Sequence, residues 1–317
     1  MTDGSIGNDS ASSEGGRIPG TPGIPAFTLC ASEPSAIPVL IAVPHGGRAY
    51  PPALLRDMRH SESVVLRLED RYVDRLALGV ARETGAGLLM AHAPRAMIDL
   101  NRAPDDIDWE MLAQTDRPRG VMLSPSRRVR SGLGLIPRRL PGMGDLWRRR
   151  LDSTELAGRI EGIHAPYHAA LEGVLGHLRE RWGAALLIDL HSMPPLPVRA
   201  GAVRTEVVIG DRFGAACHGR LIAAAFSQMA DVRREAAHNR PYAGGYVLER
   251  HADPRGGIHA MQIEIDRSCY LDSALVEPGD GMASVIGDLS ALVRRLAAVV
   301  SDLGQEIGGK GWPQAAE

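Results

Sequence analysis

The sequence predicts an α/β fold in which helices pack against a largely parallel or mixed sheet. Short aliphatic or β-branched runs, typical of buried strands, alternate along the chain with longer stretches of helical periodicity. The chain has 317 residues, 44% of them hydrophobic, which is enough to fill a substantial core. We expect a single domain over residues 26–317, after a Gly-, Ser- and Pro-rich segment at residues 1–25 that we expect to be a disordered leader.

The first predicted strand covers residues 37–43 and is aliphatic over most of its length. It ends at Pro44-His45-Gly46-Gly47, where two glycines allow a sharp turn, so His45 lies just past a strand end. From Glu62 to Glu83 apolar residues recur at helical spacing, and Gly85 provides a stop. Asp70 lies on this predicted helix.

A second strand, at residues 87–92, leads into a polar loop that contains Arg95, Asn101 and Arg102. Arginine binds carboxylates through two parallel charge-assisted hydrogen bonds, so both arginines are candidates to hold an anionic substrate. Most arginines are only solvated surface, but Asn101 beside Arg102 strengthens that pair. Residues 120–144, rich in Arg and Gly without clear periodicity, are interpreted as a long surface loop or a lid.

A helix predicted from about Ser153 to Trp182, broken or kinked near Pro166, precedes a strand at residues 184–190. His191 follows that strand directly. It therefore matches His45 in lying at the carboxyl end of an aliphatic strand, where open α/β sheets collect their ligand sites.

Further strands are predicted at residues 207–209 and 257–266, and a final helix at about residues 282–303. Alternation along the last strand places Glu264 near its middle. Between these strands, residues 239–246 combine turn formers with two tyrosines, which suits a hairpin and a loop that closes over substrate equally well.

Two histidines at strand ends suggest a metal site. Catalytic zinc binds through three protein ligands, often two histidines and a carboxylate, and leaves a fourth position open. His45 and His191 supply the imidazoles, and Asp70 or its neighbour Glu69 could supply the carboxylate. A single histidine at such a place is more often a hydrogen-bonded rim residue, at roughly two to one, but two matching cases lower those odds.

Other candidates are weaker. His164 and His168 stand one helical turn apart, but no glutamate follows His164 as the HExxH mechanism requires, so we interpret both as structural. A hydrolytic zinc also needs a base to deprotonate water, and Glu264 is the best candidate. The alternation of its strand by itself slightly favours an exposed position for Glu264.

Charge and cysteine content exclude several classes. Lys and Arg number 36 against 38 Asp and Glu, which gives no reason to expect nucleic acid or a membrane surface as partner. The three cysteines are far apart and form no CxxC pair, so we expect neither a disulfide framework nor a thiolate zinc site. No apolar run approaches the roughly 18 to 20 residues that span a bilayer. We expect a cytoplasmic protein, and the sequence sets no oligomeric state.

Six segments taken together resemble the N-formylglutamate amidohydrolase family. They are VPHGG at 43–47, EDRYVDRL at 69–76, DLNR at 99–102, DLHSMPP at 189–195, NRPYAGGY at 239–246 and MQIEIDRSCYLD at 261–272. Their order and spacing also fit, and the resemblance covers about residues 37–300. DLHSMPP and the block from PYAGGY to QIEIDR are highly specific in combination, whereas VPHGG alone is weak.

The resemblance implies a three-layer α/β/α architecture with a central mixed sheet, phosphorylase/hydrolase-like, similar to zinc carboxypeptidases and aspartoacylases. It makes His45 and His191 ligands of Zn²⁺ and Asp70 the third ligand. The HxxE motif of the carboxypeptidases is absent, because Gly47 and Arg48 follow His45-Gly46, so the third ligand departs from their pattern. Another divalent metal of the first transition row would also suit these ligands.

The implied reaction is hydrolysis of the amide bond of a small N-acylamino acid, with N-formyl-L-glutamate giving formate and L-glutamate, as in histidine catabolism. Metal-activated water attacks, Glu264 acts as general base and then acid, and Arg102 assists while holding a substrate carboxylate with Arg95 and Asn101. The remaining substrate-binding candidates are Asn239, Tyr242 and Gly245. The alternatives are a metallocarboxypeptidase or other N-acylamino acid deacylase, and a non-catalytic small-molecule-binding protein on the same fold.

Overall fold

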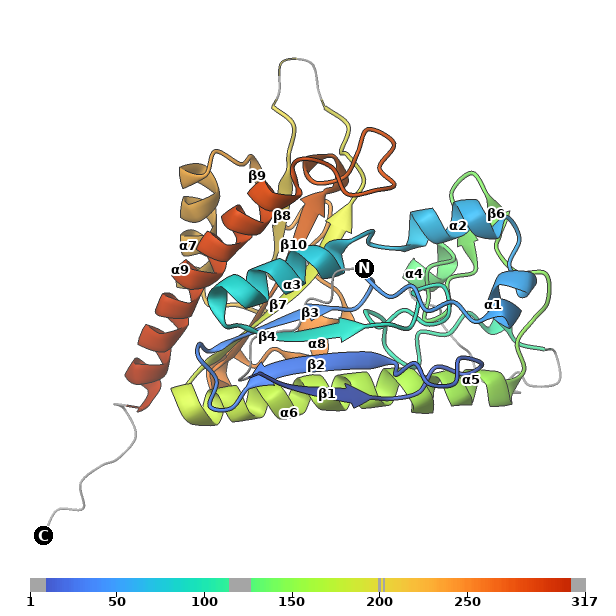
Figure 1. The fold of residues 1–317 in the computed structure, drawn as a ribbon, viewed down its shortest axis with the longest axis horizontal. Helices are drawn as coiled ribbons and strands as arrows, with labels where there is room; N and C mark the ends of the chain where they lie inside the picture. Colours follow the sequence, from blue (N-terminus) through green and yellow to red (C-terminus); the bar gives the residue numbers. More distant parts are fainter. Residues whose placement is uncertain (1–9, 114–126, 199–200, 202, 309–317) are drawn as a thin grey trace, which may run out of the picture.

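An eight-stranded mixed sheet forms the centre of the computed structural model, which describes residues 10–308 apart from 114–126, 199, 200 and 202. Its strand order is β1-β2-β4-β3-β7-β10-β8-β9 (Figure 1). The strands are β1 (Ser10–Gly15), β2 (Phe27–Ser32), β3 (Val39–Val43), β4 (Gly87–Ala91), β7 (Ala185–Met193), β8 (Val207–Gly210), β9 (Ala236–His238) and β10 (Ile258–Asp266). Strands β4, β3, β7 and β10 run parallel, and antiparallel pairings join β2 to β4 and β8 to β10.

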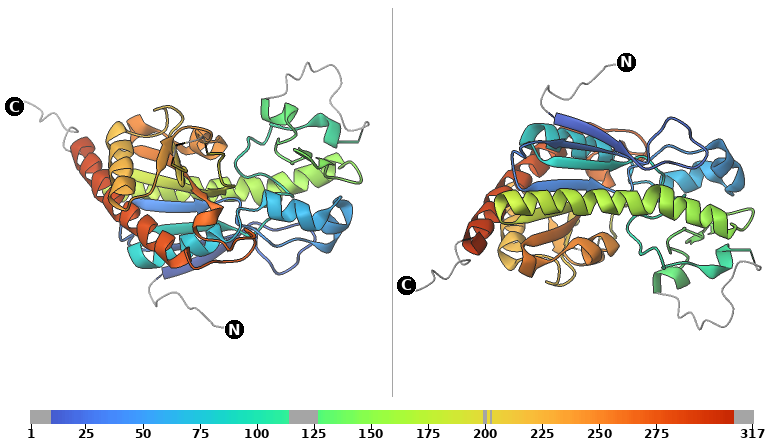
Figure 2. Two further views of the ribbon diagram at one scale, coloured as in Figure 1. Left: turned by 90° about the horizontal axis from the view of Figure 1, so that it is seen from above. Right: turned by 90° about the horizontal axis from the view of Figure 1, so that it is seen from below.

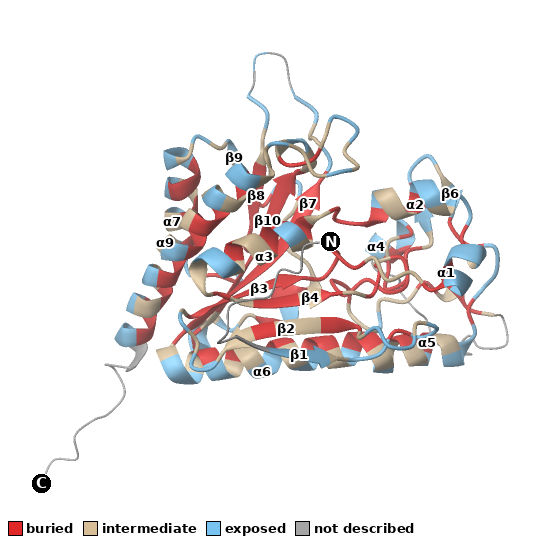
Figure 3. Cartoon of the chain, in the orientation of Figure 1, coloured by how far each residue is buried: buried red, intermediate tan, exposed pale blue. Residues whose placement is uncertain are grey.

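Helices cover both faces of this sheet, as the views of Figure 2 show. On one face lies α6 (Ala165–Trp182), and on the other lie α3 (Val73–Thr84), α7 (Gly219–Asp231) and α9 (Met282–Gly308). The side chains of β3 alternate accordingly: Leu40 packs with the α6 side, and Ile41 packs with the other three helices. The central strands β3, β7, β8 and β10 are buried on both faces (Figure 3), and the three-layer α/β/α prediction is confirmed.

The segment predicted as a leader is partly ordered. Residues 10–15 form β1, which pairs antiparallel with β2, and Ile18 is buried. The Ser- and Gly-rich composition suggested disorder, but small polar side chains are compatible with an edge strand whose hydrogen bonds come from the backbone. Residues 1–9 lie outside the described part of the chain.

The helix predicted from Glu62 to Glu83 is two helices, α2 (Ser61–Leu68) and α3. Between them Glu69 is extended and Tyr72 has a left-handed φ of 54°. The bend carries Asp70, whose backbone N–H donates to His45 O at 3.0 Å. Asp70 therefore lies in a turn beside His45 instead of on a helix. The predicted stop at Gly85 is confirmed, with a φ of 75°.

The predicted kink near Pro166 is a π-helical turn, Ile160–His164, between α5 (Ser153–Arg159) and α6. Proline has no N–H to donate, so Pro166 leaves the carbonyl of Gly162 without its helical partner. Arg17 N donates to that carbonyl at 2.7 Å. The same bond ties the residues after β1 to the helix.

Beyond the carboxyl ends of β3 and β4 lie the short helices α1 (Pro52–Asp57) and α4 (Arg127–Arg130) and the hairpin of β5 (Arg139–Leu140) and β6 (Gly144–Asp145) (Figure 1). The loop or lid predicted at 120–144 falls partly here, and its residues 120–126 lie outside the described part. The remainder is anchored by buried side chains such as Leu135. None of the described helices is both long and apolar enough to cross a membrane.

Candidate metal centre

Two histidines and one aspartate meet at the carboxyl ends of β3 and β7. One ligand atom from each of His45, Asp70 and His191 lies within 4.8 Å of the others, and all three residues are buried. His191 does not follow its strand as predicted, because β7 continues to Met193. The Oδ2 atom of Asp70 lies 3.0 Å from His191 Nδ1 and 3.5 Å from His45 Nδ1. This group could hold a metal ion.

The geometry separates Asp70 from its neighbour Glu69. The carboxylate of Glu69 turns away and pairs with Arg71 Nη1 at 2.9 Å. Asp70 instead faces both imidazoles, and its other oxygen lies 3.4 Å from Arg267 Nη2. Of the two carboxylates that the sequence left open, Asp70 is the one in the group.

Each imidazole is held from behind by a buried carboxylate. Asp99 Oδ1 lies 2.7 Å from His45 Nε2, and Asp189 Oδ2 lies 2.9 Å from His191 Nε2. Both Nδ1 atoms are thereby left to face Asp70, and that of His45 is buried without a hydrogen-bond partner. A histidine fixed by a carboxylate through its far nitrogen is the usual arrangement of a metal ligand. The residues present therefore fit a divalent cation.

The electrostatics of the group point the same way. Burial opposes ionisation of Asp70, but the hydrogen bond from His191 and the neighbouring imidazole of His45 lower its pKa. Burial would also lower the pKa of His191, yet the neighbouring charge of Asp189 raises it well above its usual value. The carboxylates thus favour a positive charge between them, which a metal cation would supply.

The pairing of two strands brings Glu264 next to this group. The parallel register of β7 and β10 sets Glu264 opposite His191 and Gln262 opposite Asp189. Glu264 is buried, against the slight expectation of an exposed position, and it accepts a hydrogen bond from Gln262 Nε2 at 2.8 Å. Burial raises its pKa to about 7, and the charge of Asp70 contributes, although His191 opposes the shift.

Asn101 connects the strands to the surrounding loops. Its Nδ2 lies 3.3 Å from Asp189 Oδ2 and 3.3 Å from His191 Nε2, while its Oδ1 accepts from Val247 N at 2.9 Å. Gly245 passes so close that a Cβ there would overlap Asn101 Oδ1. Glycine is thus required at 245 for this approach.

The cavity at the centre measures about 230 Å³ and is lined by several arginines. Arg95, predicted to bind substrate, donates from Nε to Asp99 Oδ2 at 2.9 Å. Arg102 donates to the carbonyls of Leu133 and Asn101, and forms no ion pair with a carboxylate of the described residues. The other arginines of the wall are Arg67, Arg128 and Arg267.

The segment NRPYAGGY is a loop that runs from β9 into α8 (Tyr246–His251). Tyr242 and Gly245 line the cavity, so their role in binding substrate stays a prediction, but Asn239 does not line it. The buried amide group of Asn239 donates from Nδ2 to Asp211 Oδ1 at 2.8 Å. The expectation that Asn239 touches substrate is therefore not supported by its position.

Sequence reasoning missed several residues of the site. Asp99 and Asp189 lie inside motifs already noted, and Asp189 stands two residues before His191 on one strand, a spacing that places both on one face. Gln262 stands in the same relation to Glu264. Arg267 lies inside the noted segment 261–272, whereas Arg67 and Arg128 come from separate segments that no local pattern marks.

The histidines interpreted as structural make backbone contacts beneath the site. His168 Nε2 lies 3.0 Å from the carbonyl of Leu100, and His164 Nε2 lies 2.9 Å from that of Arg102. His168 Nδ1 also lies 2.9 Å from His251 Nε2. These bonds hold the backbone on both sides of Asn101.

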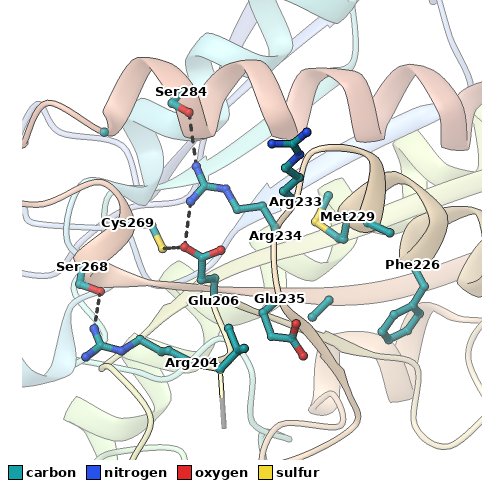
Figure 4. A pocket seen from close by; sticks show the side chains of 14 residues that line it. Arg204, Glu206, Phe226, Met229, Arg233, Arg234, Glu235, Ser268, Cys269 and Ser284 are labelled. Carbon is teal, nitrogen blue, oxygen red and sulfur yellow. Dashed lines mark hydrogen bonds and ion pairs between the residues drawn. The ribbon is translucent and has the colours of Figure 1, made fainter. Parts of the chain in front are cut away.

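A larger cavity of about 880 Å³ lies elsewhere, near the start of α9 (Figure 4). In Figure 4, Arg204 points toward Ser268, and Arg234 pairs with Glu206 at 3.1 Å and Asp288 at 2.9 Å. Within the described residues, the one group of histidine, cysteine and carboxylate side chains suited to a metal is that at His45. The smaller cavity is accordingly the site of interest.

Known proteins resemble the chain over most of its length. The profile of the family described as N-formylglutamate amidohydrolase matches residues 37–271. N-formylglutamate deformylase of Pseudomonas putida is 30% identical over 244 residues, covering 74% of this chain and 82% of that protein. The enzyme of that name from Pseudomonas aeruginosa is 28% identical over 241 residues, covering 74% and 83%.

Solved structures agree. The crystal structure of N-formylglutamate amidohydrolase from Ralstonia eutropha JMP134 superposes with a TM-score of 0.78 at 32% identity, covering 87% of this chain and 99% of that one. A gene product of Agrobacterium tumefaciens superposes with a TM-score of 0.58 at 17% identity, covering 86% and 96%, and shares the fold.

Proposed function

The chain belongs to the N-formylglutamate amidohydrolase family, and from that membership we propose that it hydrolyses the amide bond of an N-acyl acidic amino acid. The proposed substrate is N-formyl-L-glutamate. Water adds to the formyl carbon, the C–N bond breaks, and formate and L-glutamate leave. The names of both Pseudomonas relatives support this substrate. The observation that carries the proposal is the meeting of His45, Asp70 and His191 beside Glu264 in one cavity.

The proposed cofactor is zinc, held by those two histidines and Asp70. Two imidazoles and a carboxylate with an open fourth position are the ligands of many hydrolytic zinc sites. The ion would polarise the scissile carbonyl and lower the pKa of a water molecule. Asp99 and Asp189 would fix the imidazoles, and Arg267 would hold the second oxygen of Asp70.

Glu264 is the proposed general base. It would accept a proton from the attacking water and pass it to the leaving nitrogen, which needs a pKa near the working pH. Burial brings the pKa of Glu264 to about 7, where a carboxylate can both accept and return a proton. Gln262 fixes one of its oxygens, at 2.8 Å.

The arginines account for the acidic substrate. N-formylglutamate carries two carboxylates, and a guanidinium can bind each through two parallel hydrogen bonds. Arg102 and Arg128 line the cavity and form no ion pair with a carboxylate among the described residues. We propose that Arg102 binds a substrate carboxylate and also stabilises the oxyanion. Arg95, already bonded to Asp99, would act mainly by positioning His45 through that aspartate.

The test is release of glutamate from N-formylglutamate by the purified protein, zinc-loaded and chelated. N-acetylglutamate, N-acetylaspartate and a short peptide run beside it. We expect metal-dependent cleavage of the formyl compound, abolished in Glu264→Gln but retained in Glu235→Gln, since Glu235 is exposed and outside this cavity. Cleavage of the other compounds alone would reassign the substrate. Zinc binding without any turnover would leave a binding protein on the same fold.

A further inference from the structure

The small cavity at the metal centre shares a wall with a second cavity, which the proposed reaction leaves without a ligand. The second cavity measures about 850 Å³, against about 230 Å³ for the first. The shared wall consists of Asn101, Arg102, Arg128 and residues 243–245. Pockets for drug-sized ligands measure about 300–1,000 Å³. The second cavity therefore has room for a group much larger than any part of N-formylglutamate.

Beyond the shared wall, this cavity is lined by three aromatic residues and by the carboxylates of Asp105, Asp106 and Glu249, of which Glu249 pairs with Arg212 at 2.8 Å. Trp109, Phe213 and Tyr246 line it, and the Phe213 side chain is 70% exposed. Phe213 is the one aromatic residue among the large hydrophobic side chains that are exposed in the described chain. An aromatic ring gains much from burial, so a ring left exposed in a pocket wall is typical of a ligand contact.

The backbone at Phe213 has an unfavourable conformation. Arg212 and Phe213 both have left-handed φ values, of 54° and 56°, which are unfavourable for residues with a Cβ. Arg212 N donates to Ala243 O at 2.7 Å, and Asp211 N donates to Asn239 Oδ1 at 3.0 Å. Strain held in place by such contacts concentrates at functional sites. Asn239 thus supports the turn that presents Phe213.

Charge at the boundary between the cavities defines the ligand further. Arg102 and Arg128 stand on the shared wall, and neither forms an ion pair with a carboxylate of the described residues. They suit a carboxylate at the boundary. The carboxylates of Asp105, Asp106 and Glu249 in the same cavity oppose a second negative charge, so an uncharged group beyond the boundary can pack against the aromatic side chains. An acidic N-acylamino acid that carries an additional apolar group has this pattern.

We propose that the second cavity is a substrate subsite for an aromatic or long apolar group attached to an N-acylated acidic amino acid. The proposal rests on the hydrolase function proposed above and extends its substrates beyond N-formylglutamate. The apolar group can belong to the acyl side or to a residue linked after the acidic one. The chemistry of the subsite is the same for both.

The experiment compares kcat/KM of the zinc-loaded enzyme for three compounds. N-formylglutamate is the reference, N-phenylacetylglutamate extends the acyl side, and N-formylglutamylphenylalanine extends the other side. Phe213→Ser removes the ring, and Val203→Ser is the control, because Val203 is 75% exposed and lines neither cavity. We expect cleavage of at least one aromatic substrate. Phe213→Ser should lower its kcat/KM relative to N-formylglutamate roughly two- to tenfold, as an aromatic contact predicts.

An unchanged ratio in Phe213→Ser, or cleavage of N-formylglutamate alone, would overturn the subsite and leave the proposed function standing. Cleavage of the aromatic substrates alone would support the subsite and replace the proposed substrate. If no compound is cleaved, the proposed function is wrong, and calorimetry then compares binding of N-phenylacetylglutamate and glutamate. Tighter binding of the aromatic compound that Phe213→Ser removes supports the subsite, and equal binding overturns it.

Discussion

Asp189→Asn tests the metal centre directly, because it removes a charge behind one proposed ligand and keeps the shape of the side chain. Asp189 is fully buried, its Oδ2 lies 2.9 Å from His191 Nε2, and its Oδ1 has no hydrogen-bond partner. An asparagine oxygen can still accept the imidazole N–H. The substitution therefore changes the basicity of His191 as a ligand more than its orientation.

The expected loss follows from that difference. Removing a carboxylate that fixes a metal-binding histidine weakens metal binding by about 10- to 100-fold, which is about 1.4 to 2.7 kcal/mol. Since the amide retains the hydrogen bond, we expect about tenfold weaker zinc binding for Asp189→Asn and nearer 100-fold for Asp189→Ala. Zinc affinity is measured by competition with a chromophoric chelator at neutral pH.

The matched control is Asp211→Asn. Asp211 is also buried and also pairs with a histidine, His238, at 3.1 Å, but it lies outside the metal cavity. We expect its zinc affinity to equal that of the unmodified protein. Equal affinity in Asp189→Asn, or an equal loss in the control, would refute the role assigned to Asp189.

Three further outcomes follow from the geometry. Glu264 must be ionised to accept a proton, and a bound divalent cation would lower its pKa from about 7. We therefore expect kcat/KM to rise with pH and to level off by about pH 7. A rise centred well above pH 7 would contradict the proposed role of Glu264 as base. Gly245→Ala should lower kcat/KM by about 100-fold by displacing Asn101, whereas Gly173→Ala, on open α6 surface, should have no effect. Burial lowers the pKa of several histidines below the unfolded value of about 6.5, with His251 and His259 at about 4 and His168 at about 2. Below about pH 5.5, where His191 is protonated in both the folded and the unfolded chain, the unfolded chain binds about three more protons at these histidines, and the raised pKa of Glu264 offsets one of them. The free energy of unfolding of the metal-free protein, measured with denaturant, should fall by about 2 to 3 kcal/mol per pH unit from pH 5.5 to 4.5, and a constant value would contradict these pKa values.

Much of the fold could be predicted because local periodicity carries it. The strands β3, β4, β7 and β10 are continuous aliphatic or alternating runs, and the stop at Gly85 is a local signal. The bend at Asp70 could not be predicted in the same way. No glycine or proline marks it, and Tyr72 adopts a left-handed φ that the sequence gives no reason to expect.

Within the site, the sequence identifies residues near the carboxyl ends of strands. It misses residues whose place in the site is set by the pairing of neighbouring strands. Alternation alone sets Asp189 and His191 on one face of β7, and Gln262 and Glu264 on one face of β10. The tertiary structure makes these two strands neighbours, in a register that pairs Glu264 with His191, and the sequence alone does not show this pairing. Asn239 shows the opposite failure, because its motif is specific while its side chain supports a turn instead of substrate.

Asn101 contacts residues of several motifs that are distant from one another in the sequence. Its amide contacts Asp189 and His191 on one side and receives Val247 N on the other, and Gly245 leaves no space for it to move. The carbonyls of the residues before and after it are each bonded to a buried histidine of the α6 region. A side chain held from so many directions cannot adapt its position, so a ligand of this cavity would have to fit it. Such rigidity is what positioning in catalysis requires. It also implies that changes beneath the loop, far from the proposed metal, would reach the reaction through Asn101.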